Sequence, residues 1–201
     1  MSARYIALEG IEGAGKSTVA RLLGRALEGQ GHEVVLVREP GGTPTGEAIR
    51  EVLLHPDGVV APWTEAMLFA ASRAQLAAEV IAPALARGAW VIGDRSVYSS
   101  LAYQGGGREL GVDVVADVNR AGLAGVWPDL VVVLDVDPHT GLDRQDDADR
   151  IGSEGVDFQA AVAGTFAAMA ADDPERFVVV DASLPVDDVV EAILEGIEQR
   201  W

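Results

Sequence analysis

The sequence predicts an α/β fold: a doubly wound, five-stranded parallel sheet with helices on both faces. Three observations support this prediction. Short apolar runs alternate with helical stretches along the chain. Each run is apolar throughout, as strands are when helices cover both faces of a parallel sheet. The 201 residues contain no linker and no internal repeat, so residues 1–201 are expected to form one domain with a sizeable core.

The predicted elements follow in order along the chain. Strands are predicted where the apolar runs lie, at residues 5–8, 34–37, 90–92, 130–134 and 177–180. Helices are predicted at 17–28 after a glycine-rich turn, at 64–86, and at 186–199. Pro83 is expected to kink or end the second helix, because proline removes a backbone donor. Such sheets bind ligands at the carboxyl ends of their strands, and the motifs described below lie there.

Composition narrows the class of protein. The chain is 49% hydrophobic without low-complexity tracts, which is typical of an ordered globule. The absence of cysteine excludes disulfides, thiolate metal sites and cysteine nucleophiles. The first residues lack the layout of a signal peptide, and no apolar run approaches the roughly 20 residues of a membrane helix. A soluble, cytoplasmic protein is therefore expected.

The formal net charge of −17 limits which molecules the protein is expected to bind. A surface this acidic repels polyanions, so neither nucleic acid nor an anionic membrane is an expected partner. An anionic substrate must instead be held by a few local cations. The only lysine of the chain is Lys16; apart from three histidines, every other basic residue is arginine. The scarcity of lysine can reflect genome composition, but the one lysine lies where a catalytic lysine is expected.

A glycine-rich loop follows the first predicted strand and precedes the first predicted helix. Its sequence fits G-x-x-x-x-G-K-[ST], the phosphate-binding loop of P-loop NTPases. The expected nucleotide-binding residues are Gly10, Ile11, Glu12, Gly13, Ala14, Gly15, Lys16, Ser17 and Thr18. Backbone N–H groups and the helix N-terminus would surround the phosphates, Lys16 would bridge the β- and γ-phosphates of ATP, and Ser17 would bind Mg²⁺. The loop predicts NTP binding but not the acceptor.

Polar side chains also follow the second and third predicted strands. Arg38 follows the second, while Asp94 and Arg95 follow the third. The two arginines are expected to clamp the phosphate of an acceptor through charge-assisted hydrogen bonds. Asp94 is expected to bind Mg²⁺ through water or to pair with Arg95, and a purely structural Asp–Arg pair is the alternative.

Five segments together resemble the thymidylate kinase family. They are residues 10–18, 38–43 (REPGGT), 69–73 (FAASR), 94–96 (DRS) and 102–108 (AYQGGGR). The resemblance runs through almost the whole chain and weakens after about Arg144. It implies a P-loop kinase that transfers the γ-phosphoryl group of Mg·ATP to dTMP, giving dTDP, and it implies a homodimer.

The resemblance implies roles in base and sugar recognition. Phe69 would stack on thymine, Arg73 would donate to a thymine carbonyl, and an aromatic face and a planar donor fork suit these tasks. Tyr103 would pack beneath the deoxyribose, and Gln104 would contact the edge of the base. From the residues alone, Phe69 fits an ordinary helix core slightly better than a base contact, and Arg73 also fits a solvated helix face.

Further roles come from the same resemblance. Pro40 would belong to the substrate pocket, and Glu12 would orient the phosphate acceptor as a catalytic residue. Ser99 and Ser100 occupy positions that face the base in relatives, although their hydroxyls could equally cap a helix. Glu12 could alternatively be a solvent-facing carboxylate of the loop.

The sequence departs from the family in its supply of arginine to the transferred phosphoryl group. One branch of the family carries this arginine in the P-loop, at the position of Gly13. The other branch places arginines in a mobile LID, which corresponds here to residues 143–155 and contributes Arg144 and Arg150 as catalytic candidates. Such an arginine contributes on the order of 10³–10⁵ in rate. Acidic residues in the same segment weaken its positive potential, and a solvated helix end is the alternative.

Two other functions remain open from the sequence. Ser96 follows Asp-Arg where thymidylate kinases commonly carry a larger ring, and this resembles deoxynucleoside kinases, in which Glu39 could act as a general base. The segments REPGGT and YQGGGR argue against that alternative. A P-loop switch ATPase would need an Asn-Lys-x-Asp motif, but Asn119 precedes Arg120.

Overall fold

The computed structural model describes residues 3–145 and 149–201, so residues 146–148 of the predicted LID lie outside the described residues. Five strands form one sheet in the order β2-β3-β1-β4-β5, and every pair of neighbours is parallel. The predicted five-stranded parallel sheet is confirmed. Its strands are β1 (Arg4–Glu9), β2 (Val34–Arg38), β3 (Trp90–Asp94), β4 (Leu130–Asp135) and β5 (Phe177–Asp181).

The register of the sheet brings the predicted motifs to one edge. Leu8 on β1 and Arg38 on β2 both pair with Asp94, the last residue of β3. The loop that follows β1 therefore begins beside the polar residues that follow β2 and β3. The middle of the sheet is fully buried, with Ile6, Ala7 and Leu8 at 0% exposure, because helices cover both of its faces.

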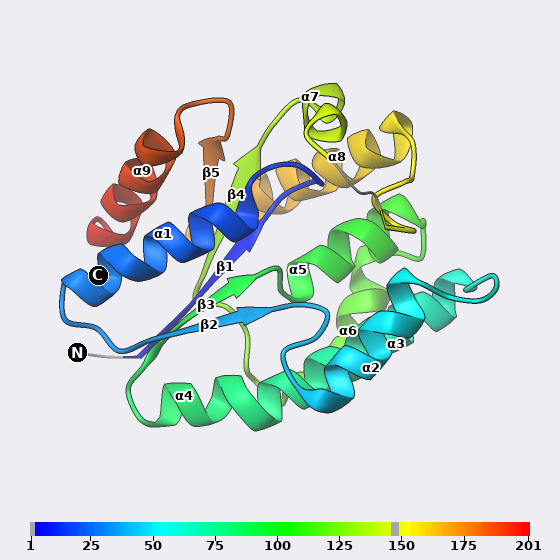
Figure 1. Ribbon diagram of the computed structural model, residues 1–201, viewed down its shortest axis with the longest axis horizontal. Coiled ribbons are helices and arrows are strands. Elements are labelled where there is room, and N and C mark those ends of the chain that lie inside the picture. The colour runs from blue at the N-terminus through cyan, green and yellow to red at the C-terminus, as the bar shows by residue number, and fades with distance from the viewer. Residues whose placement is uncertain (1–2, 146–148) are drawn as a thin grey trace.

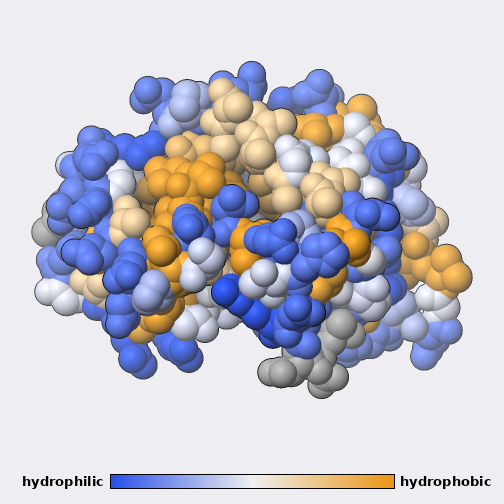
Figure 2. Space-filling model, turned by 90° about the horizontal axis from the view of Figure 1, so that it is seen from above, coloured by the Kyte–Doolittle hydropathy of each residue, from blue (hydrophilic) through white to orange (hydrophobic). Residues whose placement is uncertain are grey.

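Helices lie on both faces of the sheet (Figure 1). The helices α1 (Lys16–Gly29) and α9 (Val186–Glu198) pack together in front of the sheet, and α8 (Val156–Asp172) lies behind β4 and β5. Figure 2 shows the molecule from above, with hydrophilic residues over much of the margin and several apolar patches divided by polar residues between them. This mixed surface matches a chain that is nearly half hydrophobic and yet strongly acidic.

A long helical span runs from α3 (Pro62–Leu76) through the π-helical η1 (Ala77–Ile81) into α4 (Ala82–Ala86). The helix does not end at Pro83, because the π-helical turn just before it loosens the backbone spacing that the proline ring would otherwise disturb. By length and composition alone, this span could cross a membrane. Its buried Glu65 and Arg73 are bound to neighbouring elements of the domain instead.

Several helices were not predicted from the sequence. They are α2 (Pro44–Leu54), α5 (Val97–Ser100), the π-helical η2 (Leu101–Gly107), α6 (Val112–Leu123), α7 (Pro138–Asp143) and α8. Ser96 caps α5 by accepting from the Tyr98 N–H, and two other helices begin with a cap that is followed by proline. The Thr43 hydroxyl accepts from the Gly46 N–H of α2 at 3.0 Å, and the Asp137 carboxylate accepts from two N–H groups of α7. Proline follows each of the latter two caps at the first helical position, which is a known start signal.

Candidate active site

A cavity of about 340 Å³ opens at the carboxyl edge of the sheet. Most of the predicted site residues line it: Glu12, Gly13, Gly15, Lys16, Ser17, Thr18, Arg38, Pro40, Phe69, Arg73, Asp94, Arg95, Ser99, Ser100, Tyr103 and Gln104. Five predicted residues are not in the lining, namely Gly10, Ile11, Ala14, Arg144 and Arg150. The lining also contains Arg50 and Leu54, which the sequence did not point to, Asp149 and Ile151 of the predicted LID, and Glu39, which the sequence named only as a general base in the alternative function.

The loop between β1 and α1 wraps around the side chain of Lys16. Gly13 and Gly15 both have left-handed backbone conformations, with φ of 73° and 88°, which glycine adopts without strain. Lys16 is buried, and its Nζ donates to the carbonyl oxygens of Ile11 at 2.7 Å and Gly10 at 3.2 Å. Burial and the nearby Arg95 charge lower the pKa of Lys16 to about 8. The loop thus bends closely around one amine, and an amine together with the backbone N–H groups of such a loop is what an anion site requires.

Ser17 and Asp94 form a pair of hard oxygen ligands beside this loop. The Ser17 hydroxyl donates to Asp94 Oδ2 at 2.5 Å. Within residues 3–145 and 149–201, no three His, Asp or Glu side chains are grouped so that they could hold a metal ion by themselves. Mg²⁺ commonly takes only one or two protein oxygens and completes its octahedron with water and phosphate. The hydroxyl–carboxylate pair fits that ion.

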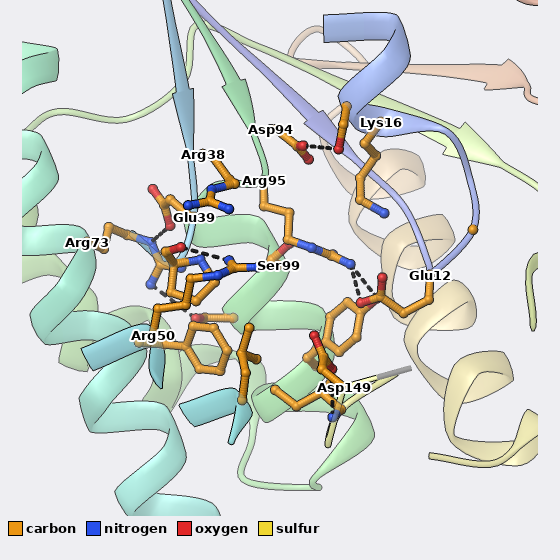
Figure 3. Close-up of a pocket in the computed structure, with 18 of the residues that line it drawn as sticks. Glu12, Lys16, Arg38, Glu39, Arg50, Arg73, Asp94, Arg95, Ser99 and Asp149 are labelled. Carbon is orange, nitrogen blue, oxygen red and sulfur yellow. Dashed lines mark hydrogen bonds and ion pairs between the residues drawn. The ribbon is translucent and has the colours of Figure 1, made fainter. Parts of the chain in front are cut away.

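Arg95 lies at the centre of the cavity (Figure 3). Its φ of 73° is uncommon for a residue with a side chain, and such a conformation persists only where its neighbours hold it. The guanidinium is in an ion pair with Glu12, and it donates to Gly10 O at 3.3 Å and Ser99 Oγ at 3.2 Å. Burial alone would raise the pKa of Glu12, but the Arg95 and Lys16 charges lower it.

A buried carboxylate supports the backbone around Arg95. Glu9, at the end of β1, is 0% exposed, and its carboxylate accepts from the backbone N–H and hydroxyl of both Ser96 and Ser99 at 2.5–3.1 Å. Burial raises the pKa of Glu9, although these serines and Arg95 oppose the shift. Because Ser96 directly follows Arg95, this cluster fixes the backbone position from which the Arg95 side chain extends into the cavity.

Arg73, on α3, is buried and almost fully bound by the protein. Its Nε donates to Glu39 at 2.6 Å, its Nη1 donates to Ser100 Oγ and Asn119 Oδ1, and its Nη2 donates to the Ser96 carbonyl. An arginine has five N–H donors, so these four bonds leave one N–H on Nη2 for a ligand. Burial raises the pKa of Glu39 to about 7, against the attraction of Arg73.

Two further arginines complete the positive side of the cavity. Arg38 is half-exposed and pairs with Glu47 at 2.9 Å, while Arg50 on α2 donates to the Pro40 carbonyl at 2.9 Å. In Figure 3, the side chains of Arg38 and Arg50 lie on the same side of the cavity as Glu39 and Arg73, Lys16 lies opposite, and Arg95 lies between them with its guanidinium directed to Glu12. The site therefore presents several cations to an anion in a protein whose net charge is −17.

The two LID arginines, Arg144 and Arg150, bind protein groups and do not line the cavity. Arg144 Nη1 donates to the Ala182 carbonyl at 3.3 Å, beside the loop that follows β5. Arg150 donates to the Leu53 carbonyl at 2.8 Å and forms an ion pair with Glu65 at 2.7 Å. Within the P-loop, Gly13 lies so close to α7 that a Cβ added to it would overlap the carbonyl of Gly141. An arginine at the Gly13 position does not fit this structure.

A P-loop at the end of a central strand, a hydroxyl–carboxylate pair for Mg²⁺ and a cluster of arginines facing them together define a phosphotransferase of the P-loop class. A family model described as thymidylate kinase matches residues 8–193. The thymidylate kinase of Pelotomaculum thermopropionicum is 45% identical, with 98% of each chain covered; that of Clavibacter sepedonicus is 48% identical, covering 92% of this chain and 90% of the relative.

A solved structure agrees with these matches. The crystal structure of thymidylate kinase from Ehrlichia chaffeensis superposes with a TM-score of 0.82 at 28% identity, covering 98% of this chain and 99% of that one. The chain belongs to the thymidylate kinase family, as the sequence segments predicted.

Proposed function

We propose that the protein transfers the γ-phosphoryl group of ATP to dTMP and so produces dTDP. The observation that carries this proposal is the arrangement of two anion sites in one cavity. The P-loop with Lys16 lies on one side, Arg38 and Arg50 lie on the other, and Arg95 lies between the two. An acceptor that is already ionised needs arginines more than it needs a general base. Membership of the thymidylate kinase family supports the same reaction.

ATP and Mg²⁺ are the proposed donor and cofactor. The backbone N–H groups of the P-loop and Lys16 would hold the β- and γ-phosphates, and Ser17 with Asp94 would hold the metal ion. When bound, Mg²⁺ neutralises charge on the transferring group. Arg95 would contribute to the same task from the acceptor side, because its guanidinium reaches Glu12 of the P-loop. On the acceptor side, Phe69, Arg73, Tyr103 and Gln104 would read the base and sugar.

A parallel assay tests the acceptor. Purified protein with Mg·ATP is offered dTMP in one reaction and thymidine in another, and the ADP formed is measured. We expect turnover of dTMP, slight turnover of thymidine, slow ATP hydrolysis without an acceptor, and loss of activity with EDTA. Turnover of thymidine alone would favour a deoxynucleoside kinase, for which the family matches give no support. Fast hydrolysis without an acceptor would favour a switch ATPase.

The LID is proposed to supply the arginine that contacts the transferred phosphoryl group, because Gly141 closes off the alternative position at Gly13. Arg144→Ala and Arg150→Ala are each expected to lower kcat, and at least one of them by about 10³-fold or more. Arg120→Ala removes an exposed arginine on α6 and serves as the control. If both LID variants keep kcat within about tenfold of the control, the arginine does not come from this segment.

A homodimer and a cytoplasmic location stay predictions. The exposed apolar side chains of Val52, Trp63 and Met67 on α2 and α3 are what a partner surface would use. We propose that a second copy of the chain covers them.

A further inference from the structure

A buried carboxylate outside the cavity lining connects base recognition to the rest of the domain. Glu65 lies on α3 at 1% exposure. Phe69 and Arg73 follow it at four-residue intervals, so the three side chains share one face of the helix. The lining includes Phe69 and Arg73 but not Glu65. Glu65 therefore lies beside the proposed base pocket without being part of its surface.

Glu65 is held by three neighbours, two through hydrogen bonds and one through an ion pair. Gln104 Nε2 donates to its Oε1 at 2.9 Å, Arg108 contacts both carboxylate oxygens at 3.3 Å, and Arg150 pairs with Oε2 at 2.7 Å. Burial would raise the pKa of Glu65, but these contacts lower it. An ionised carboxylate has no proton to donate, so it accepts hydrogen bonds and cannot supply them.

This contact decides which end of the Gln104 amide faces the cavity. A glutamine amide has a donor nitrogen and an acceptor oxygen, and its orientation follows from its hydrogen bonds. Because the nitrogen is directed at Glu65, the oxygen is directed away from it, toward the cavity that Gln104 lines. Throughout the described ranges 3–145 and 149–201, no protein group donates a hydrogen bond to that oxygen. It is available to a ligand.

We propose that Glu65 is a positioning residue for base selection, because it fixes Gln104 with its carbonyl oxygen toward the base. This inference rests on the proposed function. Arg73 offers one N–H to the same cavity, so the pocket presents a donor and an acceptor. Thymine has an N–H beside a carbonyl oxygen and can satisfy both. Cytosine presents these two functions in the reverse order, a bare ring nitrogen and an amino group, so in the same position it would leave both protein groups unsatisfied.

Glu65→Gln tests this assignment, because a neutral amide can donate as well as accept and would let Gln104 turn over. The ratio of kcat/KM for dTMP to that for dCMP is measured on one preparation, so the fraction of folded enzyme cancels. We expect this ratio to fall by about 10- to 100-fold through a higher KM for dTMP, with the KM for ATP unchanged. A ratio equal to that of the wild type would overturn the proposal.

Glu79→Gln is the matched control. Glu79 accepts from Gln75 Nε2 at 2.8 Å in the same kind of pair, but on the exposed surface of the same helical span. This variant is expected to leave the substrate ratio unchanged. Failure of the wild type to use dTMP would count against the proposed function, whereas an unchanged ratio in an active Glu65→Gln enzyme would count against Glu65 alone.

A second measurement needs no variant of Glu65. In the NMR spectrum of the wild-type protein, the side-chain amide protons of Gln104 are expected to exchange with solvent at least about tenfold more slowly than those of Gln75, because only the former pair is buried. If the two amides exchange at similar rates, the Gln104–Glu65 bond does not hold in solution and the proposal is wrong. This test applies even if Glu65→Gln does not fold.

Discussion

Lys16→Ala is expected to lower kcat for dTMP phosphorylation by at least about 10²–10³-fold, the effect of removing one preorganised donor from a reaction centre. The chain has no second lysine that could take over the charge. The folded state should survive, because among the described residues the Lys16 amine bonds only to two carbonyls of its own loop. Steady-state kinetics and thermal unfolding on the same preparation measure both effects.

Arg25→Ala is the control for this change, because Arg25 is an exposed cation on the same helix as Lys16. It removes one positive charge without touching the cavity, so kcat should stay near the wild-type value. If Lys16→Ala keeps more than about a tenth of wild-type kcat, the lysine is not part of the phosphoryl-transfer machinery.

Arg73→Lys is expected to raise the KM for dTMP by about 10- to 100-fold while leaving the KM for ATP unchanged. A lysine can keep the charge beside Glu39. It cannot span Glu39, Ser100 and Asn119 as the planar fork does, so the remaining N–H would no longer face the cavity. Alanine is a poorer probe, because an uncompensated buried Glu39 would cost about 3–5 kcal/mol of stability.

The control for Arg73 comes from an exposed pair of the same type. Arg87 Nε donates to Glu33 at 2.8 Å, and both side chains are about half exposed to solvent. Arg87→Lys should change neither KM nor thermal stability beyond the small effect of a surface ion pair. A fall in the melting temperature of Arg73→Lys with no change in the KM for dTMP would mean that Arg73 only holds the fold together.

The sheet could be predicted from the sequence because its strands are apolar on both faces and stand out from their surroundings. Helix α8 could not be placed in this way, since it is apolar almost all round and its alanines give no clear periodicity. The residues Thr43 and Pro44, a cap followed by proline, do indicate where α2 begins. A cap alone does not indicate how far the helix extends.

The candidate site could be predicted where its residues are adjacent in sequence. The P-loop and the residues after β2 and β3 belong to local motifs, and the structure brings them to one cavity. Arg50 was missed because one arginine on an amphipathic helix looks the same whether it faces solvent or a pocket. The bonds from Arg73 to Asn119 and from Gln104 to Glu65 join residues 46 and 39 positions apart, and no local pattern specifies such pairs.

The close approach of Gly13 and Gly141 has an evolutionary consequence. A side chain at Gly13 would overlap the backbone of α7, and one at Gly141 would press on the Glu12 carbonyl, so neither position can change alone. A lineage with this geometry cannot acquire a P-loop arginine by a single codon change. It would first have to rebuild the segment that begins at α7. A chain that carries an arginine at the position of Gly13 therefore needs a different backbone path at α7.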